Sequence, residues 1–347
     1  MFIVQSRGAG AGRGLHVIQA GRGSGGCPVK SRQARKPHQA RGPYKARKPL
    51  VAAAAVSVAA LIAAACGSSN GNSSGSGGSA SPTPTASGKV TSIANQVPGS
   101  IRNKGTLIVA ADATYAPNEF IASNGTTVIG MDADMAQAIG KVMGLKVTMQ
   151  NATFDTILPG LQSGKYNLGM SSFTDTKERE KIVDFVTYFV AGTSFYVKSS
   201  GGPPVTKLAD LCGHTVAVEK GTTQQADAAA QSGKCKSAGK AGVTVQVYND
   251  QNAVNLALSS GRAQVAMADS PVAEYQVKKS NGTFKLSGPS YGDAPYGIAV
   301  PKNSGMTQPT LAAVKHIMAD GTYQQILKKW GLTSGAISNP GINKAVS

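Results

Sequence analysis

Apolar and polar residues alternate in regular blocks from Ile101 onward. Short apolar runs typical of buried strands are separated by longer stretches with an apolar residue every three or four positions, as in amphipathic helices. Over roughly 245 residues this alternation occurs in two successive sets, which favours two lobes over one. Alternating strands and helices imply α/β units built on mostly parallel sheets.

The clearest helix covers 132–143, where Met135, Ile139 and Val142 share one face and Gly144 supplies a stop signal. The other elements follow from the same periodicities, with strands of four to six residues between helices. The expected strands are 107–111, 146–150, 166–170, 193–197, 215–218, 243–248 and 264–268, and the other expected helices are 154–162, 222–231, 252–259 and 270–277, with one more after Asp175.

Polar residues cluster where an expected strand leads into an expected helix. Four such places are 112–118, 171–179, 221–225 and Asp269. In open sheets with parallel strands, ligands bind at the carboxyl ends of the strands, where these connections meet. The pattern therefore predicts a ligand site to which all four clusters contribute.

The stretch 169–179 forms the first part of that site. Asp175 is expected to cap the following helix, with Glu178 three residues later as its partner in a capping box. The free backbone N–H groups of a helix start, together with the forked guanidinium group of Arg179, suit a carboxylate. The alternative is an ordinary capped surface helix with Arg179 in solvent.

A second helix start and an acidic residue extend the prediction to a zwitterion. Within 221–224, Thr222 and Thr223 present hydroxyl groups and free N–H groups, although threonine is also a common helix cap. Asp269 ends a buried strand and either caps the next helix or pairs with an ammonium group. Two helix starts and Arg179 favour an anion, and Asp269 facing them suits a cation.

Two aromatic residues of the first set are candidates for the middle of the site. Tyr115 and Phe154 either pack in the core or lie on both sides of the apolar part of a ligand side chain. Asp112, just after the first strand, is placed to meet the polar end of that side chain.

Residues 1–65 have the composition of an export signal. The chain has 35 Lys and Arg against 17 Asp and Glu, but residues 1–49 hold 11 of the basic residues and no acidic one. Without them 24 basic residues remain against 17 acidic ones, so the net charge falls from +18 to near +7 and does not argue for nucleic-acid binding. The apolar run 50–65 is shorter than the ~20 residues of a spanning helix and follows a basic flank, as in signal peptides.

Cys66 directly follows the small residues 63–65. This arrangement resembles a bacterial lipoprotein signal, in which Cys66 becomes the lipid-bearing first residue of the mature chain. The alternative is an ordinary signal peptide with an incidental cysteine. The long basic region also favours a start at a later codon, for example Val29. Residues 66–100 are rich in Gly, Ser and Pro and are expected to form a flexible tether.

The cysteines agree with export. Cys27 precedes the expected cleavage site and Cys66 would carry the lipid, which leaves Cys212 and Cys235 in the folded part. In an oxidising compartment such a pair is expected to form a structural disulfide, and the alternative is two buried thiols. No spacing of His and Cys residues indicates a metal site, so neither a metal nor another cofactor is expected.

The junction motifs together resemble family 3 of the solute-binding proteins that serve ABC uptake systems for polar amino acids. The resemblance extends from Ile101 to Leu332. It is carried by the motifs LIVAADATYAP (107–117), GMDADMA (130–136), FDTILPGLQSG (154–164), MSSFTDTKER (170–179), GTTQ (221–224), AD (268–269), PYGIAV (295–300) and DGTYQQILKKW (320–330), the last of which resembles the closing helix of the family.

This resemblance implies an α/β fold of the type II periplasmic-binding-protein kind. Two lobes, each a mostly parallel sheet flanked by helices, are joined by two crossing hinge segments, here expected near 196–199 and 294–297. The first lobe would then comprise 101–197 and 297–347, and the second lobe 198–296. Ligand would close the lobes about the hinge.

The resemblance also implies roles for individual residues. Arg179 would bind the α-carboxylate of an amino acid with the help of Thr174 and Thr223, and Ser172 and Asp269 would hold its α-amino group. Tyr115, Phe154 and Asp112 would meet the side chain, while Asn118 stands where many members have Phe and leaves the ligand open. The candidate ligand-binding residues are Asp112, Tyr115, Asn118, Phe154, Ser171, Ser172, Thr174, Arg179, Thr222, Thr223 and Asp269.

The expected function is extracytoplasmic capture of a polar or basic amino acid and its delivery to a permease. The protein is expected to be a monomer, anchored to the membrane by a lipid on Cys66, without catalytic activity and without nucleic acid as a partner. The alternatives are a dehydratase acting on small carboxylates, as in a few relatives of this fold, and a ligand-sensing module. A dehydratase needs a positioned acid or base, and the junction motifs contain no His.

Overall fold

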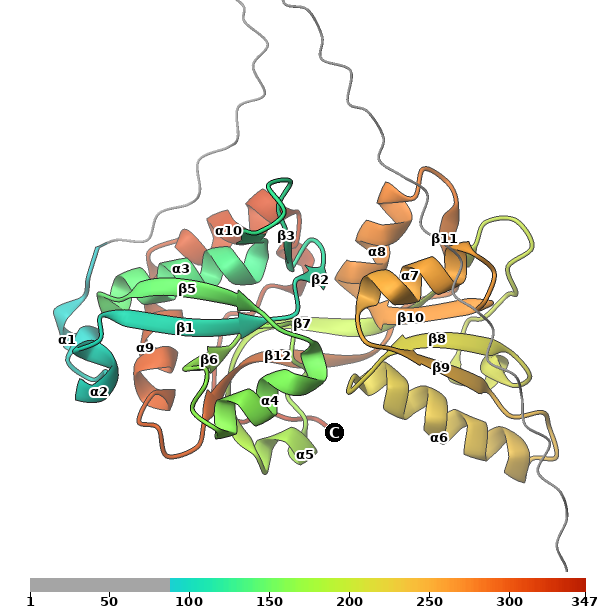
Figure 1. Cartoon of the computed structure of the whole chain (residues 1–347), viewed down its shortest axis with the longest axis horizontal. Helices are drawn as coiled ribbons and strands as arrows, with labels where there is room; N and C mark the ends of the chain where they lie inside the picture. Colours follow the sequence, from blue (N-terminus) through green and yellow to red (C-terminus); the bar gives the residue numbers. More distant parts are fainter. Residues whose placement is uncertain (1–87) are drawn as a thin grey trace, which may run out of the picture. The chain divides into compact units, whose positions relative to one another are not determined.

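The computed structural model describes residues 88–347. Most strands of this part join one sheet in the order β5-β1-β6-β12-β7-β10-β8-β9, with β11 beside β7, and a small sheet has the order β2-β3-β4 (Figure 1). The strands are β1 (Thr106–Ala111), β2 (Thr114–Tyr115), β3 (Glu119–Ile121), β4 (Val128–Ile129), β5 (Lys146–Asn151), β6 (Leu168–Gly169), β7 (Val183–Lys198), β8 (Thr215–Glu219), β9 (Thr244–Tyr248), β10 (Val265–Asp269), β11 (Phe284–Leu286) and β12 (Tyr291–Pro301). The helices are α1 (Thr91–Ala94), α2 (Gly99–Arg102), α3 (Met131–Met143), α4 (Phe154–Gln162), α5 (Lys177–Glu180), α6 (Thr223–Ser237), α7 (Gln251–Ser259), α8 (Ser270–Lys279), α9 (Thr307–Ala319) and α10 (Thr322–Trp330), with short 3-10 turns η1 (Leu208–Leu211) and η2 (Thr333–Gly335).

The first lobe consists of the elements beside β5, β1 and β6, where β1 pairs in parallel with both neighbours. Helix α3 contacts α9 and α10 and faces its core. Met135, Ile139 and Val142 are buried, as their spacing predicted, and α3 ends at Gly144. Gly144 adopts φ 71°, a left-handed conformation that favours glycine, and its N–H donates to carbonyl groups of the last turn.

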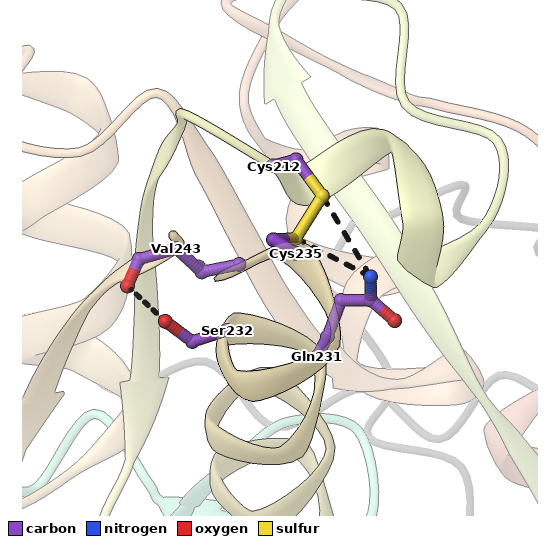
Figure 2. Close-up of a disulfide and its surroundings, with 5 residues drawn as sticks. All are labelled: Cys212, Gln231, Ser232, Cys235 and Val243. Carbon is purple, nitrogen blue, oxygen red and sulfur yellow. Dashed lines mark hydrogen bonds between the residues drawn. A yellow bond between two sulfur atoms is a disulfide. The ribbon is translucent and has the colours of Figure 1, made fainter. Parts of the chain in front are cut away.

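The second lobe consists of β8 to β11 with α6, α7 and α8, and β8 pairs in parallel with β9 and β10. Cys212 and Cys235, the pair expected to be joined, form a disulfide that links the end of η1 to the last turns of α6 (Figure 2). The Gln231 amide lies 3.4 Å from one sulfur and 3.8 Å from the other. The Ser232 hydroxyl donates to the Val243 carbonyl at 3.0 Å, which ties α6 to the start of β9.

Two long antiparallel strands, β7 and β12, pass through both lobes (Figure 1). β7 pairs with β12 up to Thr193 and with β10 from Thr193 to Val197, so one strand belongs to both lobes. β12 changes register between Tyr291 and Ala294. The change of partner at Thr193 precedes the segment 196–199, where the sequence predicts the first crossing, and the exact lobe boundaries stay a prediction.

One helix start differs from the prediction. The helix after Asp175 is a single short turn, α5, and Thr176 caps it by accepting a hydrogen bond from the Arg179 N–H at 3.3 Å. The expected capping box of Asp175 and Glu178 is therefore wrong. The Asp175 carboxylate instead accepts a hydrogen bond from the Lys344 N–H at 2.6 Å, because the end of the chain packs against this segment.

The folded part begins earlier than predicted. Residues 88–100, expected to belong to the tether, contain α1 and the start of α2, and Ile93 and Val97 are buried in the core of the first lobe. Here a few apolar residues at helical spacing are enough to form helices, although the segment around them is polar. The expected signal region 1–65, the lipidation at Cys66 and the rest of the tether lie outside the described residues.

Helices long and apolar enough to cross a bilayer are not found among residues 88–347.

Candidate functional site

A cavity lies between the two lobes, where strand ends of both lobes lead into helices. Eight of the eleven candidate residues line it: Tyr115, Phe154, Ser172, Thr174, Arg179, Thr222, Thr223 and Asp269. The remaining lining residues were not predicted and are Gln224, Gln251, Ala268 and Val272. The other three candidates, Asp112, Asn118 and Ser171, are buried behind this wall.

Arg179 reaches from the first lobe to the second. Its guanidinium group donates to the Thr174 carbonyl at 2.8 Å and to the Gly221 carbonyl at 3.0 Å, and it lies 5.2 Å from the ring centre of Phe154. Burial lowers the pKa of Arg179 to about 10, so the group keeps its charge at neutral pH. Within residues 88–347 no carboxylate forms an ion pair with it. The surface alternative is excluded, and the charge remains for an anion.

The N-terminus of α6 faces the same space from the second lobe. Thr222 caps this helix, because its hydroxyl group accepts a hydrogen bond from the Gln225 N–H at 3.2 Å and donates to the Glu219 carbonyl at 2.7 Å. Thr223 is the first helical residue and lines the cavity. The first-turn N–H groups and the helix dipole add to Arg179 in attracting an anion.

Asp269, the last residue of β10, supplies negative charge on the wall of the cavity. It stands at the start of α8, yet its side chain makes no capping hydrogen bond. Its oxygens accept hydrogen bonds from Gln224 at 2.7 Å and from the Tyr296 hydroxyl at 2.5 Å. Burial raises the pKa of Asp269, and these hydrogen bonds together with the charge of Arg179 lower it. An oriented carboxylate of this kind suits an ammonium group.

Ser172 lines the cavity in a left-handed backbone conformation, with φ 49°. Asn118 donates to its hydroxyl group at 2.8 Å, the hydroxyl group donates to Glu119 at 3.2 Å, and the Ser172 N–H donates to Asp132 at 3.0 Å. Asn118 therefore acts on the cavity through Ser172. Burial and the neighbouring Asp132 raise the pKa of Glu119, and burial raises that of Asp132 to about 6. These buried carboxyl groups hold the serine in place.

Tyr115 and Phe154 form an aromatic wall of the cavity. Their ring centres lie 5.9 Å apart, and Phe154 stacks on Phe173 at 4.5 Å. Both candidate rings are buried in the core and also line the cavity, so the core interpretation is confirmed, and their placement on both sides of a ligand side chain stays a prediction. The wall offers apolar surface for the carbon chain of a ligand.

Asp112 orients this wall from behind. One oxygen accepts a hydrogen bond from the Thr114 hydroxyl group at 2.7 Å, and the other accepts one from the Phe154 N–H at 3.0 Å at the start of α4. The Asp112 N–H donates to the Ser171 hydroxyl group at 2.8 Å, which joins the ends of β1 and β6. Ser171 thus supports the site without lining the cavity.

Gln224 and Gln251 are site residues that the sequence did not single out. The Gln224 amide donates to Thr193 at 2.8 Å as well as to Asp269, and the Gln251 amide donates to the Tyr196 hydroxyl group at 2.7 Å. Gln224 belongs to the predicted 221–225 cluster, so its signal was present. Gln251 also follows the end of a strand, β9, but it lies outside the four predicted polar clusters.

Glu219 is a third residue that was missed. It is the last residue of β8, as Asp269 is the last residue of β10. Its place as an acidic residue at the end of an apolar strand is the sequence pattern that could have indicated a site residue. Glu219 is 1% exposed, and among residues 88–347 neither carboxylate oxygen has a hydrogen bond of good geometry, although Tyr115 and Asp112 lie close enough to act on it. The Tyr115 hydroxyl group also has no partner. Burial first, and then the nearby Asp112, raise the pKa of Glu219 to about 10.

Several contacts join the lobes across the cavity. Lys220 forms an ion pair with Asp155 at 2.7 Å, and the Gln251 N–H donates to the Thr114 hydroxyl group at 3.2 Å. Together with the hydrogen bond from Arg179 to the Gly221 carbonyl, they hold the lobes in a closed arrangement.

A further contact between the lobes is aromatic. Phe120 of β3 lies 6.3 Å from Tyr275 of α8, measured between ring centres. On its other side Phe120 meets Trp330 of α10 edge to face at 5.8 Å. A residue of the first lobe thus connects the second lobe with the last helix of the first.

Groups of three or more His, Cys, Asp or Glu side chains arranged to hold a metal ion do not occur within residues 88–347.

Comparison with known proteins agrees with this geometry. Residues 107–333 match the model of the bacterial extracellular solute-binding proteins, family 3. The arginine-binding protein ArgT of Corynebacterium glutamicum is 34% identical over 256 residues, covering 74% of this chain and 84% of that protein.

Solved structures agree with the fold as well. An ancestral arginine-binding protein bound to arginine has a TM-score of 0.60 at 38% identity, covering 65% of this chain and 98% of that one. An ancestral arginine-binding protein bound to glutamine has a TM-score of 0.61 at 36% identity, covering 66% of this chain and 98% of that one. With its two lobes, shared strands and junction residues, the chain belongs to family 3 of the bacterial extracellular solute-binding proteins.

Proposed function

We propose that this protein captures an amino acid outside the cytoplasm by closing its two lobes and delivers it to the permease of an ABC transporter. The observation that carries the proposal is the charge pattern of the cavity. Arg179 and the N-terminus of α6 attract an anion, and Asp269 offers a hydrogen-bonded carboxylate to a cation. An α-amino acid carries both charges on one carbon atom.

The α-carboxylate is assigned to Arg179, with Thr174 and Thr223 beside it, and the α-amino group to Asp269 and Ser172. All five residues line the same cavity. Arg179 is held by the Thr174 carbonyl group of its own lobe, and closure adds the Gly221 carbonyl group, so little conformational freedom is lost when a carboxylate binds. The side chain of the ligand then runs along Tyr115 and Phe154.

Arginine is the ligand that we propose. The aromatic wall continues toward Asp112 and Glu219, where carboxyl groups are buried without a cationic partner among the described residues. A guanidinium group matches such an end in charge and in number of donors. Arginine-binding relatives at 34% and 38% identity support this choice.

The assignment to lobes follows the strands. We propose 88–193 and 297–347 for the first lobe and 194–296 for the second, because β7 changes partner at Thr193 and because Ile93 and Val97 pack in the core of the first lobe. Opening would break the contacts of Arg179 with Gly221 and of Lys220 with Asp155, and ligand binding would restore them.

Family 3 proteins act outside the cytoplasm, and the disulfide between Cys212 and Cys235 agrees with an oxidising compartment. We propose further that Cys66 carries a lipid anchor, that the folded part works as a monomer, and that Cys66 and the residues after it link that part to the membrane. Mass spectrometry of the mature protein would detect a lipid on Cys66.

The relatives are binding proteins of transport systems, so this chain is a binding protein and not an enzyme. The dehydratase alternative needs a general acid or base at the ligand. The cavity is lined by no His, and the carboxylate of Asp269 is engaged by Gln224 and Tyr296.

Calorimetric titration with the twenty amino acids tests the proposal. Arginine should bind with a Kd in the micromolar range or below. Agmatine, which is arginine without its α-carboxylate, should bind at least about 100-fold more weakly because Arg179 loses its partner. Absence of binding by every amino acid would overturn the proposed function, and equal binding of arginine and agmatine would overturn the role of Arg179.

A further inference from the structure

Two buried carboxyl groups from opposite lobes face each other behind Tyr115. Asp112 follows β1 in the first lobe, and Glu219 ends β8 in the second. They are 2% and 1% exposed, and the pKa of each is raised by burial and altered by the other. Lobe closure therefore brings two acidic groups together out of water.

The two groups differ in their partners. The oxygens of Asp112 accept hydrogen bonds from Thr114 and from the Phe154 N–H. Neither oxygen of Glu219 has a hydrogen bond of good geometry within residues 88–347, and the polar side chains that act on it are the Tyr115 hydroxyl group and the Asp112 carboxyl group. A fully buried carboxyl group without a hydrogen bond is costly, and native structures rarely keep one without a purpose. Glu219 is therefore poised for a group that arrives with the ligand.

Within residues 88–347, the charged groups that act on Glu219 are acidic. The elements packed around it present Asp112, Tyr115 from β2, and Asp250 from the start of α7, and each of these raises its pKa or offers it only a hydroxyl group. Asp250 caps α7 by accepting a hydrogen bond from the Ala253 N–H. Lys220, the next residue in the chain, is engaged by Asp155 at 2.7 Å.

Glu219 does not line the cavity but lies behind residues that do. Tyr115, Thr222 and Gln251 line it, and the Thr222 hydroxyl group donates to the backbone carbonyl of Glu219. A ligand held by Arg179 and Asp269 sends its side chain along Phe154 and Tyr115, toward the Tyr115 hydroxyl group. That hydroxyl group, too, is buried without a partner.

Closure changes the protonation of Glu219 unless a cation enters. In an open form that exposes the carboxyl group to water, its pKa would be about 4.3 and it would be ionised at neutral pH. In the closed arrangement burial and Asp112 raise the pKa to about 10, so the group holds a proton at neutral pH. A positive charge beside it lowers the pKa again and lets the group close in its ionised form.

We propose, building on the amino-acid capture described above, that Glu219 makes lobe closure depend on the charge of the ligand side chain. A cationic side chain closes the lobes without proton exchange, and a neutral one closes them only when Glu219 takes up a proton. Glu219 thereby selects for a guanidinium or ammonium group at the far end of the ligand, with Asp112 as its fixed neighbour.

Linkage gives the sign of the effect. For a neutral ligand the closed complex holds one proton more than the open protein between the two pKa values of Glu219. The affinity for that ligand therefore rises about tenfold for each unit by which the pH falls toward 5. For a cationic ligand the proton numbers are equal, and the affinity is constant over the same range.

Arginine and citrulline form the test pair, because citrulline replaces the guanidinium group by a neutral urea of nearly the same shape. Both are titrated calorimetrically into the protein between pH 5.5 and 8, in buffers that differ in their enthalpy of ionisation. Citrulline should bind about tenfold more tightly for each unit of decrease in pH, with uptake of about one proton. Arginine should show neither effect.

Glu219→Gln is the decisive variant, and Glu274→Gln on the exposed face of α8 is the matched control. The glutamine should abolish the pH dependence of citrulline binding, weaken arginine binding at least about tenfold, and strengthen citrulline binding at pH 8. The control should match the unmodified protein. If Glu219→Gln does not fold, the pH dependence of citrulline binding to the unmodified protein still tests the proposal.

Citrulline binding that is independent of pH and involves no proton would overturn the proposal, as would an equal effect of Glu219→Gln on both ligands. Absence of binding by arginine, citrulline and every other amino acid would instead overturn the proposed function.

Discussion

The two ends of the cavity are built in opposite ways. At the end formed by Arg179 and Asp269, each charged group is already held by neighbours: two carbonyl groups hold the guanidinium group, and Gln224 and Tyr296 hold the carboxylate. At the end formed by Asp112 and Glu219, the oxygens of Glu219 lack a hydrogen bond of good geometry, and within residues 88–347 the charged groups that act on Glu219 are acidic.

The difference corresponds to what is constant and what varies among amino acids. A group that meets the same carboxylate or ammonium in every ligand gains from being held in place before binding, since less ordering is needed. A group that must distinguish one side chain from another is selective when it lacks a hydrogen-bond or charge partner before the ligand binds. A wrong ligand then leaves that group buried without a partner. Variants at the two ends should therefore differ in kind as well as in size.

The largest effect is expected at the prepared end. Arg179→Ala should weaken binding of every amino acid at least about 100-fold, because the α-carboxylate then lies in the cavity without its cation. Calorimetric titration with arginine measures the loss. Arg262→Ala, at an exposed position between α7 and β10, is the control and should leave the affinity unchanged. A loss confined to arginine would contradict the assignment of Arg179 to the constant part of the ligand.

Asp269→Asn should follow, with a loss of about 10- to 100-fold that is the same for arginine and citrulline. The amide keeps the shape and a hydrogen bond to Gln224 or Tyr296 but loses the charge that faces the α-amino group. The ratio of the two affinities is the informative measurement. A change in that ratio would mean that Asp269 reads the side chain, and the contrast between the ends would fail.

Asp112→Asn should have a smaller effect of about tenfold or less, and it should appear as a change in the ratio of arginine to citrulline affinity. One charge is lost at the far end, while an amide oxygen keeps one of the two hydrogen bonds, to Thr114 or to the Phe154 N–H. The free energy of unfolding should fall by about 1 kcal/mol, because the Asp112 carboxylate accepts a hydrogen bond from the first turn of α4 and the amide can keep only one of the two hydrogen bonds. An unchanged ratio would remove Asp112 from side-chain recognition.

The smallest effect on binding is expected from the disulfide. Replacing Cys212 and Cys235 together by Ser should lower the free energy of unfolding by about 2–4 kcal/mol and change the arginine affinity less than about threefold. The bond lies near the last turns of α6, whereas Thr222 caps the end that faces the ligand. Thermal unfolding with and without reductant measures the change in stability. A large loss of arginine affinity would show that the disulfide, and not the Thr222 cap alone, holds the N-terminus of α6 in place at the ligand.

Much of the fold could be predicted because the decisive signals are local. The spacing of Met135, Ile139 and Val142 with Gly144 behind them defines α3 in the sequence as in the structure. The cap of α5 could not be predicted in the same way. Asp175 and Thr176 are neighbours and both suit a cap, and the choice depends on the Lys344 N–H, which arrives from the far end of the chain.

The candidate site shows the same division. Residues at junctions, such as Arg179 and Thr223, were found because helix starts have recognisable signatures. The role of Glu219 could not be predicted, because it depends on the contact with Asp112 of the other lobe. The local sequence does not indicate which strand ends will face each other in the fold. The sharing of β7 between lobes was hidden for a similar reason, since a strand that changes partner at Thr193 shows no break in its apolar pattern.

Trp330 turns the aromatic contact between the lobes into an optical reporter. It is the one tryptophan of the chain, and it lies at right angles to Phe120, which also contacts Tyr275 of the second lobe. Separation of the lobes would withdraw Tyr275 and expose the pair to water, so the emission of Trp330 should shift as the lobes open. Closure can thus be followed by the emission wavelength of the intrinsic fluorescence of the unlabelled protein, in the same titrations that measure affinity.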